Sequence, residues 1–283
     1  MFGQQKQLKI YIKGLNNMEA NERDDNLFAD ERKEYIVEYV NLNKKTTVTK
    51  LCEHFSVSPA TIRNDLRELE TNGRLKRTHG GAMANIKTTF ELQSNQKVVK
   101  DMSQKLAIAK IAADYVADGD SVCIDTGTTT FEFAKLLVDK KDLIVVTNDI
   151  YIAAFFEKKT NFKIMLTGGM VRNGFGCLTG SNAIDSIKDL RVDKSFMSTN
   201  GFSTTRGAST PNLEMSEIKR HMLMIADEKI MLCTSSKLGR ASFSKFADIS
   251  DFDSLITDTG IPDLIRKEFE DVGIEVEIAE VQE

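Results

Sequence analysis

The chain has few of the residues that build metal centres and disulfide frameworks. Its 283 residues include four cysteines and three histidines. The cysteines are scattered and form no C-x-x-C pair, so we expect neither a zinc site nor a disulfide framework. Reduced and mostly buried thiols are expected instead, at Cys52, Cys123, Cys177 and Cys233. We predict no metal, no cofactor and no catalytic residues.

Long apolar stretches are also missing. There is no run of about 18 apolar residues, which excludes a transmembrane helix. The N-terminal residues have neither the apolar stretch nor the small-residue cleavage site of a signal peptide. We therefore expect a cytoplasmic protein that does not bind membranes. Residues 1–28 are polar, show no usable period, and are expected to form a disordered extension.

What the chain does have is enough length for two domains, with 28% charged and 41% hydrophobic residues, as in ordinary globular proteins. The formal net charge of the whole chain is −4. Residues 44–81, by contrast, hold eight Lys or Arg against four Asp or Glu. A basic block in an acidic chain is typical of a contact with nucleic acid.

The basic block contains a helix-turn-helix pattern. Leu51 and Phe55 lie four residues apart, as on one face of a first helix. Ser58-Pro59 predicts the start of a second helix, because Ser is a good N-cap and Pro loses no hydrogen bond at the first helical position. The second helix has one buried stripe, formed by Ile62, Leu66 and Leu69. A helix over residues 32–40 should pack behind these two.

Polar residues on the second helix and on the segment after it are the candidates for DNA contacts. Asn72-Gly73 predicts a left-handed C-cap, and the basic strand from Arg74 to His79, followed by Gly80-Gly81, predicts a wing. Arg grips guanine edges or phosphates, and Asn pairs with adenine. A helical hairpin with a solvated face is the alternative, and the basic wing favours DNA. The predicted DNA-binding residues are Ser58, Thr61, Arg63, Asn64, Arg67, Lys76, Arg77 and His79.

From Ser103 onward, short apolar runs alternate with helical patterns. A buried helix is expected at 105–116, and further helices near 129–138, 148–157, 181–190, 212–227 and 262–271. Strands are predicted at 121–124, 143–146, 163–166, 195–197, 230–232, 254–256 and 274–278. This alternation predicts an α/β domain with a mostly parallel sheet covered on both faces. The expected domains are a winged helix-turn-helix at 29–85, a linker at 86–102 and an α/β sensor domain at 103–283.

Polar residues follow five consecutive predicted strands, and in a parallel sheet ligands bind where the strands end. The first of these exits, residues 125–130, places backbone N–H groups and Thr hydroxyls at a helix N-terminus, which suits an anion. Lys237 could supply a positive charge, so the expected ligand is a phosphorylated sugar or polyol. The predicted effector-binding residues are Asp125, Gly127, Thr128, Thr129, Thr130, Thr147, Asn148, Gly168, Gly169, Asn200, Gly201, Glu214, Lys219, Ser236 and Lys237.

Two enzyme patterns compete with this interpretation. Asp125-Thr126-Gly127 and Asp258-Thr259-Gly260 look like the two halves of an aspartic-protease site, which needs two β-lobes whose carboxylates share a proton. Each triplet instead leads into a predicted helix, so the protease is rejected. A phospho-aspartyl enzyme would need a magnesium site built from further acidic strand ends, and the other exits are neutral.

Two sets of motifs point to one protein family. In the first half they are Val57-Ser58, Thr61-Ile62-Arg63, Asp65-Leu66, Leu69-Glu70, Gly73, Arg77 and His79-Gly80-Gly81-Ala82. In the second half they are Asp125, Gly127-Thr128-Thr129-Thr130, Val146-Thr147-Asn148, Gly168-Gly169, Val192-Asp193-Lys194, Thr210-Pro211-Asn212, Lys219-Arg220 and Ser235-Ser236-Lys237. From about Ala29 to its C-terminus, the sequence resembles the DeoR family of bacterial transcriptional regulators.

The resemblance implies a sensor domain similar in fold to ribose-5-phosphate isomerase, without isomerase activity, that binds a phosphorylated sugar. It implies a repressor that leaves its double-stranded operator DNA, beside a carbohydrate-utilisation operon, when this effector binds. Asn200 and Thr234 stand where the family usually has Asp, which makes the pocket less acidic. An activator would use the same contacts. One winged helix reads a short half-site, so we expect a homodimer or tetramer.

An enzyme remains the competing class. It would be a sugar-phosphate isomerase or transferase with Asp125 or Glu214 as its catalytic carboxylate. The basic wing would have no role in such an enzyme, so the regulator is the preferred prediction.

Overall fold

The computed structural model describes residues 29–281 except 44, 73, 85–87 and 90. The predicted extension, residues 1–28, lies outside this part. The chain divides into two compact units, residues 1–86 and 87–283. Each unit has its own hydrophobic core. None of the helices in the described ranges is long and apolar enough to cross a membrane.

The N-terminal unit is a three-helix bundle with a small antiparallel sheet. Its helices are α2 (Ala29–Asn43), α3 (Val48–Phe55) and α4 (Pro59–Thr71), and its strands are β1 (Lys45–Thr47), β2 (Leu75–Thr78) and β3 (Gly81–Ala84). The sheet order is β1-β3-β2. The two predicted helices and the wing are confirmed, and Leu51, Phe55, Ile62, Leu66 and Leu69 are buried in one core. The strand β1 was not predicted, because three residues are too few to show a period.

The turn between α3 and α4 has the expected chemistry. Ser56 adopts the left-handed conformation with φ of 53° and ends α3. The Ser58 hydroxyl accepts the Thr61 backbone N–H at 3.1 Å, with Pro59 at the first helical position. Both features of the predicted helix start are therefore confirmed. The helix α4 ends at Thr71 with Asn72 as its C-cap, and the predicted left-handed cap at Gly73 lies outside the described residues.

A buried ion pair fixes α2 against α4. The Arg32 guanidinium donates to both carboxylate oxygens of Asp65, at 2.7 and 3.2 Å. Only 14% of the Arg32 side chain and 7% of the Asp65 side chain are exposed. A two-point pair of this kind adds geometric specificity to its energy. It therefore sets the orientation of α4, the helix that carries the predicted DNA contacts.

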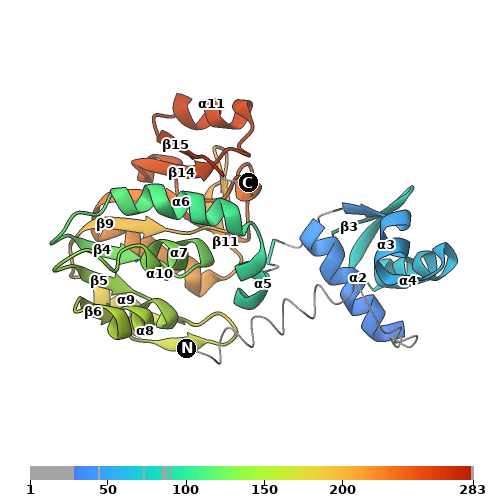
Figure 1. The fold of residues 1–283 in the computed structure, drawn as a ribbon, viewed down its shortest axis with the longest axis horizontal. Helices are drawn as coiled ribbons and strands as arrows, with labels where there is room; N and C mark the ends of the chain where they lie inside the picture. The colour runs from blue at the N-terminus through green and yellow to red at the C-terminus, as the bar shows by residue number, and fades with distance from the viewer. Residues whose placement is uncertain (1–28, 44, 73, 85–87, 90, 282–283) are drawn as a thin grey trace. The chain divides into compact units, whose positions relative to one another are not determined.

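The C-terminal unit is built on a seven-stranded sheet in the order β15-β14-β12-β9-β4-β5-β6 (Figure 1). Every pairing in this sheet is parallel. The strands are β4 (Ser121–Ile124), β5 (Ile144–Thr147), β6 (Lys163–Leu166), β9 (Val192–Met197), β12 (Ala226–Leu232), β14 (Ser254–Asp258) and β15 (Glu275–Ala279). The predicted parallel sheet is confirmed.

Helices cover both faces of this sheet. On one face lie α6 (Met102–Asp114), α7 (Thr128–Lys135) and α8 (Ile150–Lys159), and on the other lie α9 (Ser181–Ile187), α10 (Leu213–Met224) and α11 (Asp263–Asp271). Strand β4 shows why: Val122 and Ile124 pack in the first core with Phe133, whereas Cys123 packs in the second core with Met222. Alternate residues of a strand point to opposite faces, so apolar residues at every position require cover on both sides.

Several short elements were not predicted. They are α5 (Ser94–Val99), β7 (Met170–Arg172), β8 (Cys177–Thr179), β10 (Gly201–Ser203), β11 (Gly207–Thr210), β13 (Ser244–Ala247) and the 3-10 turns η1 (Ser235–Lys237) and η2 (Ile249–Asp251). The most important is α5, which falls in the stretch expected to be a linker. The structure packs it in the C-terminal unit, where the Ser94 N–H donates to the Gly174 carbonyl at 3.3 Å.

The strand order reverses between β4 and β9. From β4 the chain runs through β5 to β6 in one direction, and it then continues from β9 through β12 and β14 to β15 in the other. In an open α/β sheet, the crevice outside the carboxyl ends of the strands at such a point is the usual ligand site. The residues just after β4 and β9 are therefore the first place to look for one.

Candidate functional site

The predicted DNA-contact residues lie on the surface of the N-terminal unit. Arg63, Asn64 and Arg67 are exposed on α4, on the side away from the buried stripe of that helix. The Arg67 guanidinium donates to the Asn64 amide oxygen at 3.1 Å. At the start of α4 the hydroxyls of Ser58 and Thr61 lie 2.9 Å apart. The exposed side of α4 is therefore polar and carries two arginines, a composition that suits contact with the base edges in a DNA major groove.

The wing carries the remaining predicted contacts, Lys76, Arg77 and His79, and all three are exposed. It is fastened to α4 through Glu70, which accepts the Arg77 backbone N–H at 2.8 Å. The same carboxylate lies 3.7 Å from the Arg77 guanidinium. The position of the wing relative to α4 is therefore held by a side chain of α4 itself.

The C-terminal unit has a cavity of about 360 Å³ at the carboxyl ends of β4 and β9, the point where the strand order reverses. This volume lies in the usual range for small-molecule sites, roughly 300–1,000 Å³. Apolar side chains from α5, α7, α10 and the β7–β8 turn form part of the wall, namely Val98, Phe131, Met215 and Phe175. The polar part comes from the strand exits, from α5 and from the β7–β8 hairpin.

Six of the residues predicted to bind an effector line this cavity: Gly127, Thr128, Thr129, Asn200, Lys219 and Lys237. The first three form the start of α7. The first-turn N–H groups of a helix have no acceptor within the helix, so they favour an anion. Gly127 approaches β9 closely, because a Cβ there would lie 3.0 Å from the Ser198 hydroxyl oxygen.

Asp125 does not line the cavity, contrary to its predicted contact with effector hydroxyls. Its side chain has no exposed surface, and it accepts hydrogen bonds from the Ser198 N–H at 2.9 Å and the Ser198 hydroxyl at 2.8 Å. The Lys219 ammonium donates to the same carboxylate oxygen. Asp125 therefore joins the ends of β4 and β9 to α10 through one carboxylate oxygen, and its side chain is buried behind the cavity wall.

Asn148, Thr147 and Thr130 also lie behind the cavity wall. The Asn148 amide oxygen accepts the Thr126 N–H at 3.0 Å, and the Thr147 hydroxyl donates to the Ile124 carbonyl at 2.7 Å. The Thr130 hydroxyl donates to the Gly127 carbonyl at 3.0 Å. These side chains hold the loop after β4 in shape, so their role is to position the cavity wall.

The remaining predicted effector residues lie elsewhere, since none of them is part of the cavity lining. A Cβ at Gly169 would lie 2.3 Å from the Thr179 carbonyl, and one at Gly201 would lie 2.7 Å from the Arg240 carbonyl. Both are glycines because another backbone segment passes close by. Gly168 is the chain neighbour of Gly169, and its backbone N–H donates to the Ser186 hydroxyl at 3.3 Å.

The last two predicted effector-binding residues, Glu214 and Ser236, make polar contacts outside the cavity lining. Glu214 is exposed and accepts the Thr179 hydroxyl at 3.0 Å. The Ser236 hydroxyl donates to Asp101 at 2.8 Å. Neither side chain reaches the cavity.

The structure adds residues that the sequence did not single out, above all Glu91, Lys97, Arg172 and Asp149. Glu91 and Lys97 fell in the presumed linker, and Arg172 lies on a three-residue strand with no readable period. Asp149 had a usable signal, because an acid between a strand and a helix is a typical N-cap. It accepts the backbone N–H groups of Tyr151 and Ile152.

The cavity is rich in positive charge. Lys97, Arg172, Lys219 and Lys237 all line it. Lys219 is paired with Asp125, and Lys97 and Arg172 are paired with Glu91. In the part of the chain that the structure describes, no carboxylate pairs with the Lys237 ammonium. Burial lowers the pKa of Lys237, and burial likewise lowers the pKa of Lys97. A half-buried lysine without a paired carboxylate favours a bound anion, which would offset the lost hydration of the ammonium.

The enzyme alternatives find no support in this geometry. Asp258 accepts from the Ser235 N–H and hydroxyl at 2.7 and 2.8 Å, and Asp125 is held by Ser198 and Lys219. The two carboxylates therefore belong to separate clusters and share no proton, which rules out a protease dyad. No group of three or more His, Cys, Asp or Glu among the described residues could hold a metal ion.

Two family models match the chain. One is described as the DeoR C terminal sensor domain and matches residues 100–259. The other is described as the DeoR-like helix-turn-helix domain and matches residues 32–88. The matches cover both units and include the predicted DNA face and most of the cavity.

Relatives match over most of the chain. The HTH-type transcriptional regulator GlpR of Haloferax volcanii is 36% identical over 246 residues, which is 87% of this chain and 96% of GlpR. The transcriptional repressor AccR of Agrobacterium fabrum is 31% identical over 249 residues, 85% of this chain and 96% of AccR. Among solved structures, ribose 5-phosphate isomerase A from Methanocaldococcus jannaschii is 16% identical with a TM-score of 0.37, covering 49% of this chain and 55% of that one. A likeness at that level concerns the backbone alone.

Proposed function

Because the chain belongs to the DeoR family of transcriptional regulators, we propose that it is a DNA-binding repressor controlled by a phosphorylated sugar or polyol. The winged helix-turn-helix binds the operator of a carbohydrate-utilisation operon. The cavity of the C-terminal unit binds the effector, and binding weakens the hold on DNA. The name of one relative, the transcriptional repressor AccR, supports repression over activation.

The observation that carries the effector class is that the Lys237 ammonium, which pairs with no carboxylate in the described part of the chain, lines the cavity together with the start of α7. Both line the same cavity, and together they offer a positive charge and outward-facing N–H groups, the chemistry that recognises phosphate. A phosphate here would accept from the Thr128 and Thr129 N–H groups and from Lys237. Asn200 lines the neighbouring exit, after β9, where its amide donates to Glu91 at 3.3 Å and accepts the Thr210 hydroxyl at 3.2 Å. We propose that it turns to the hydroxyls of the sugar when the effector binds.

The competing isomerase or transferase would need a free carboxylate at the bound carbon chain. Asp125 is fully buried in a cluster with Ser198 and Lys219, and Glu214 is outside the cavity lining. The two acids that do line the cavity, Glu91 and Asp149, are held by an ion pair and a helix cap. Among the residues that the structure describes, this leaves no free carboxylate in the cavity lining for proton transfer, so a binding site is the better proposal.

The test is the binding of phosphosugars and of their unphosphorylated parents to the wild-type protein and to Lys237→Met. We expect phosphosugars to raise the melting temperature and the parent sugars to have little effect. Since a charge-assisted hydrogen bond contributes roughly 1.5–3 kcal/mol, the Lys237→Met variant should bind phosphosugars about tenfold or more weakly. Lys110→Met, which changes an exposed lysine on α6, controls for the change in net charge. Equal stabilisation by a sugar and its phosphate would contradict the phosphate site.

We also propose that the protein works as a homodimer or tetramer. A single winged helix reads only a short half-site, and symmetric dimers bind two such half-sites. Light scattering of the full-length protein with and without operator DNA measures the mass. A monomer in both conditions would contradict this part of the proposal.

A further inference from the structure

The cavity already contains an anion that belongs to the chain. Glu91 lies ahead of α5, and only 8% of its side chain is exposed. One carboxylate oxygen lies 2.6 Å from the Lys97 ammonium, and the other lies 2.7 Å from the Arg172 guanidinium. The Asn200 amide donates to the first oxygen at 3.3 Å. A carboxylate therefore sits among donors that also line the proposed effector site.

These donors have no preference for a carboxylate over a phosphate. A guanidinium and an ammonium suit either anion, and a phosphate brings more charge and more acceptor oxygens. Burial alone would raise the pKa of Glu91, but Lys97 and Arg172 outweigh it and hold that pKa below its ordinary value. Glu91 is therefore an anion at neutral pH, in the place that a negatively charged ligand would take.

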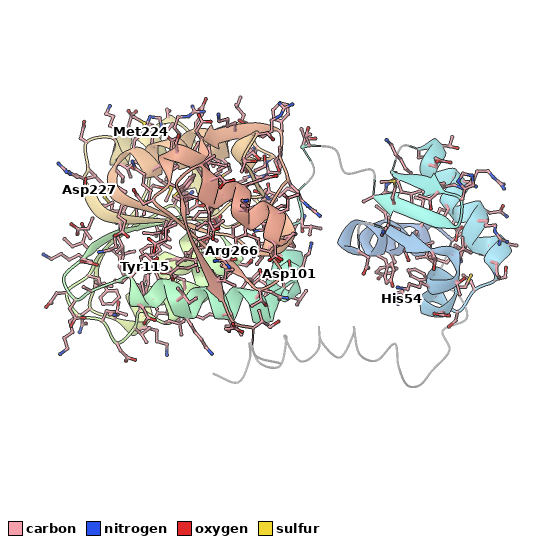
Figure 2. The ribbon with its side chains drawn as sticks, turned by 90° about the horizontal axis from the view of Figure 1, so that it is seen from above. His54, Asp101, Tyr115, Met224, Asp227 and Arg266 are labelled. Atoms are coloured by element: carbon pink, nitrogen blue, oxygen red, sulfur yellow. The ribbon has the colours of Figure 1, made fainter. Side chains whose placement is uncertain are left out.

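The segment that carries Glu91 is fastened to the rim of the cavity. The Ser94 hydroxyl donates to the Phe175 carbonyl at 3.2 Å, and the Arg172 guanidinium stacks on the Phe175 ring at 3.7 Å. Asp101, at the start of α6 (Figure 2), accepts the Ser236 hydroxyl at 2.8 Å. The far end of the segment is thus tied to η1, next to Lys237. Its near end, Glu91, is held inside the cavity itself.

We propose that Glu91 is a built-in competitor for the effector, and that the anionic group of the effector replaces its carboxylate on Lys97 and Arg172. This rests on the proposed function, and it adds Lys97 and Arg172 to the effector-binding residues. Replacement frees Glu91 from the cavity, while Lys97 keeps α5 on the effector. Because residue 91 follows the N-terminal unit, which ends at residue 86, the release of Glu91 is the step that connects effector binding to that unit.

The physical basis is a competition between two anions. Lys97 is close enough to Lys219 and Arg172 for their charges to lower its pKa, after the larger effect of burial. A phosphate added to this cluster attracts Lys97 and repels the Glu91 carboxylate, so the two anions cannot both be well satisfied. An effector shifts a population only as far as its affinities for the two states differ. Here the difference arises because only the state without Glu91 offers Lys97 and Arg172 in addition to Lys237.

The experiment uses the full-length protein, inorganic phosphate as the probe, and hydrogen exchange of residues 91–99 as the second measurement. Glu91→Gln keeps the size and removes the charge. We expect it to bind phosphate about fivefold or more tightly, the lower end of typical coupling between sites, and to exchange faster in α5 before phosphate is added. Arg172→Gln should also speed exchange in α5, but it should weaken phosphate binding. Asp120→Asn, which breaks an ion pair with Lys194 outside the cavity lining, should change neither measurement.

If Glu91 competes with the anion, the Glu91 and Arg172 variants should change phosphate affinity in opposite directions. If both changes only loosen the packing, they should change it in the same direction. If Glu91→Gln and Arg172→Gln both weaken phosphate binding, Glu91 is a structural residue and the competition is overturned. If Glu91→Gln binds phosphate as the wild-type protein does, the competition is also overturned, while the phosphate site proposed above stands. If neither the wild-type protein nor any variant binds phosphate or phosphosugars, the proposed function fails together with the competition. The failure of the competition alone can therefore be told apart from the failure of both.

Discussion

Replacing both Arg63 and Arg67 by Ala should lower operator affinity by a factor of about 30 to 10⁴. A bidentate contact from Arg to a base contributes about 1–3 kcal/mol, and each 1.4 kcal/mol corresponds to a factor of about ten. Both side chains are exposed on α4 and neither contributes to the core, so the loss should come from DNA contacts and the fold should be unchanged. Gel shifts with the natural operator and with an unrelated duplex measure the effect.

Two further variants sharpen this result. Lys158→Ala with Lys159→Ala removes the same charge from an exposed part of α8 and should leave operator affinity within about twofold, because neither lysine belongs to the unit that carries the proposed DNA contacts. Lys76→Ala should weaken binding to both duplexes alike and reduce the salt slope by about 1, as for a phosphate contact. If the double arginine variant binds the operator as tightly as the wild-type protein does, α4 is not the recognition helix.

Replacing Asp125 by Ala should destabilise the C-terminal unit by about 3–5 kcal/mol, the cost of leaving one partner of a buried ion pair behind. The Lys219 ammonium would be left with the Ser198 carbonyl at 3.1 Å and the Ser198 hydroxyl at 3.3 Å, and with no carboxylate at its 3% exposed side chain. Faster hydrogen exchange in β4 and β9 is the expected observation, since Asp125 joins their ends.

The double variant Asp125→Ala with Lys219→Met tests the cause. Removing both charges should restore much of the lost free energy of unfolding, because the unpaired ammonium is then absent. If Asp125→Ala alone costs less than about 1 kcal/mol, or if the double variant is less stable than either single one, the ion pair does not hold these strands together.

Most helices and strands of the fold could be predicted from the sequence, because local patterns determine them. The stripe of Ile62, Leu66 and Leu69 needs only helical spacing, and the cap at Ser58 needs only a side chain and an N–H three residues later. The same holds for the parallel sheet, where continuous apolar strands require cover on both faces. The short hairpin that carries Arg172 had no such pattern, since three residues show no period.

The cavity could be predicted only in part. The start of α7 could be predicted as part of the cavity, because a Gly and three Thr between a strand and a helix place N–H groups and hydroxyls at a helix N-terminus, which favours an anion. Asp125 and Asn148 were assigned to the ligand from their place at strand ends. Each points to a partner that is distant in the sequence, Lys219 for Asp125 and the Thr126 N–H for Asn148. A position at a sheet edge therefore does not predict which side chains face the cavity and which stabilise the loops that form its wall.

By itself, the sequence determined the two units, the helix proposed to present arginines to DNA, the parallel sheet and the edge of that sheet where a ligand is proposed to bind. These depend on periods, caps and strand ends, which are properties of neighbouring residues. Only the tertiary structure decided that Glu91 and Lys97 line the cavity, together with Arg172 from a hairpin 75 or more residues away in the sequence. A charged residue in a polar stretch looks the same whether it is solvated or paired inside a cavity, because burial and ion pairing arise only when distant segments pack together.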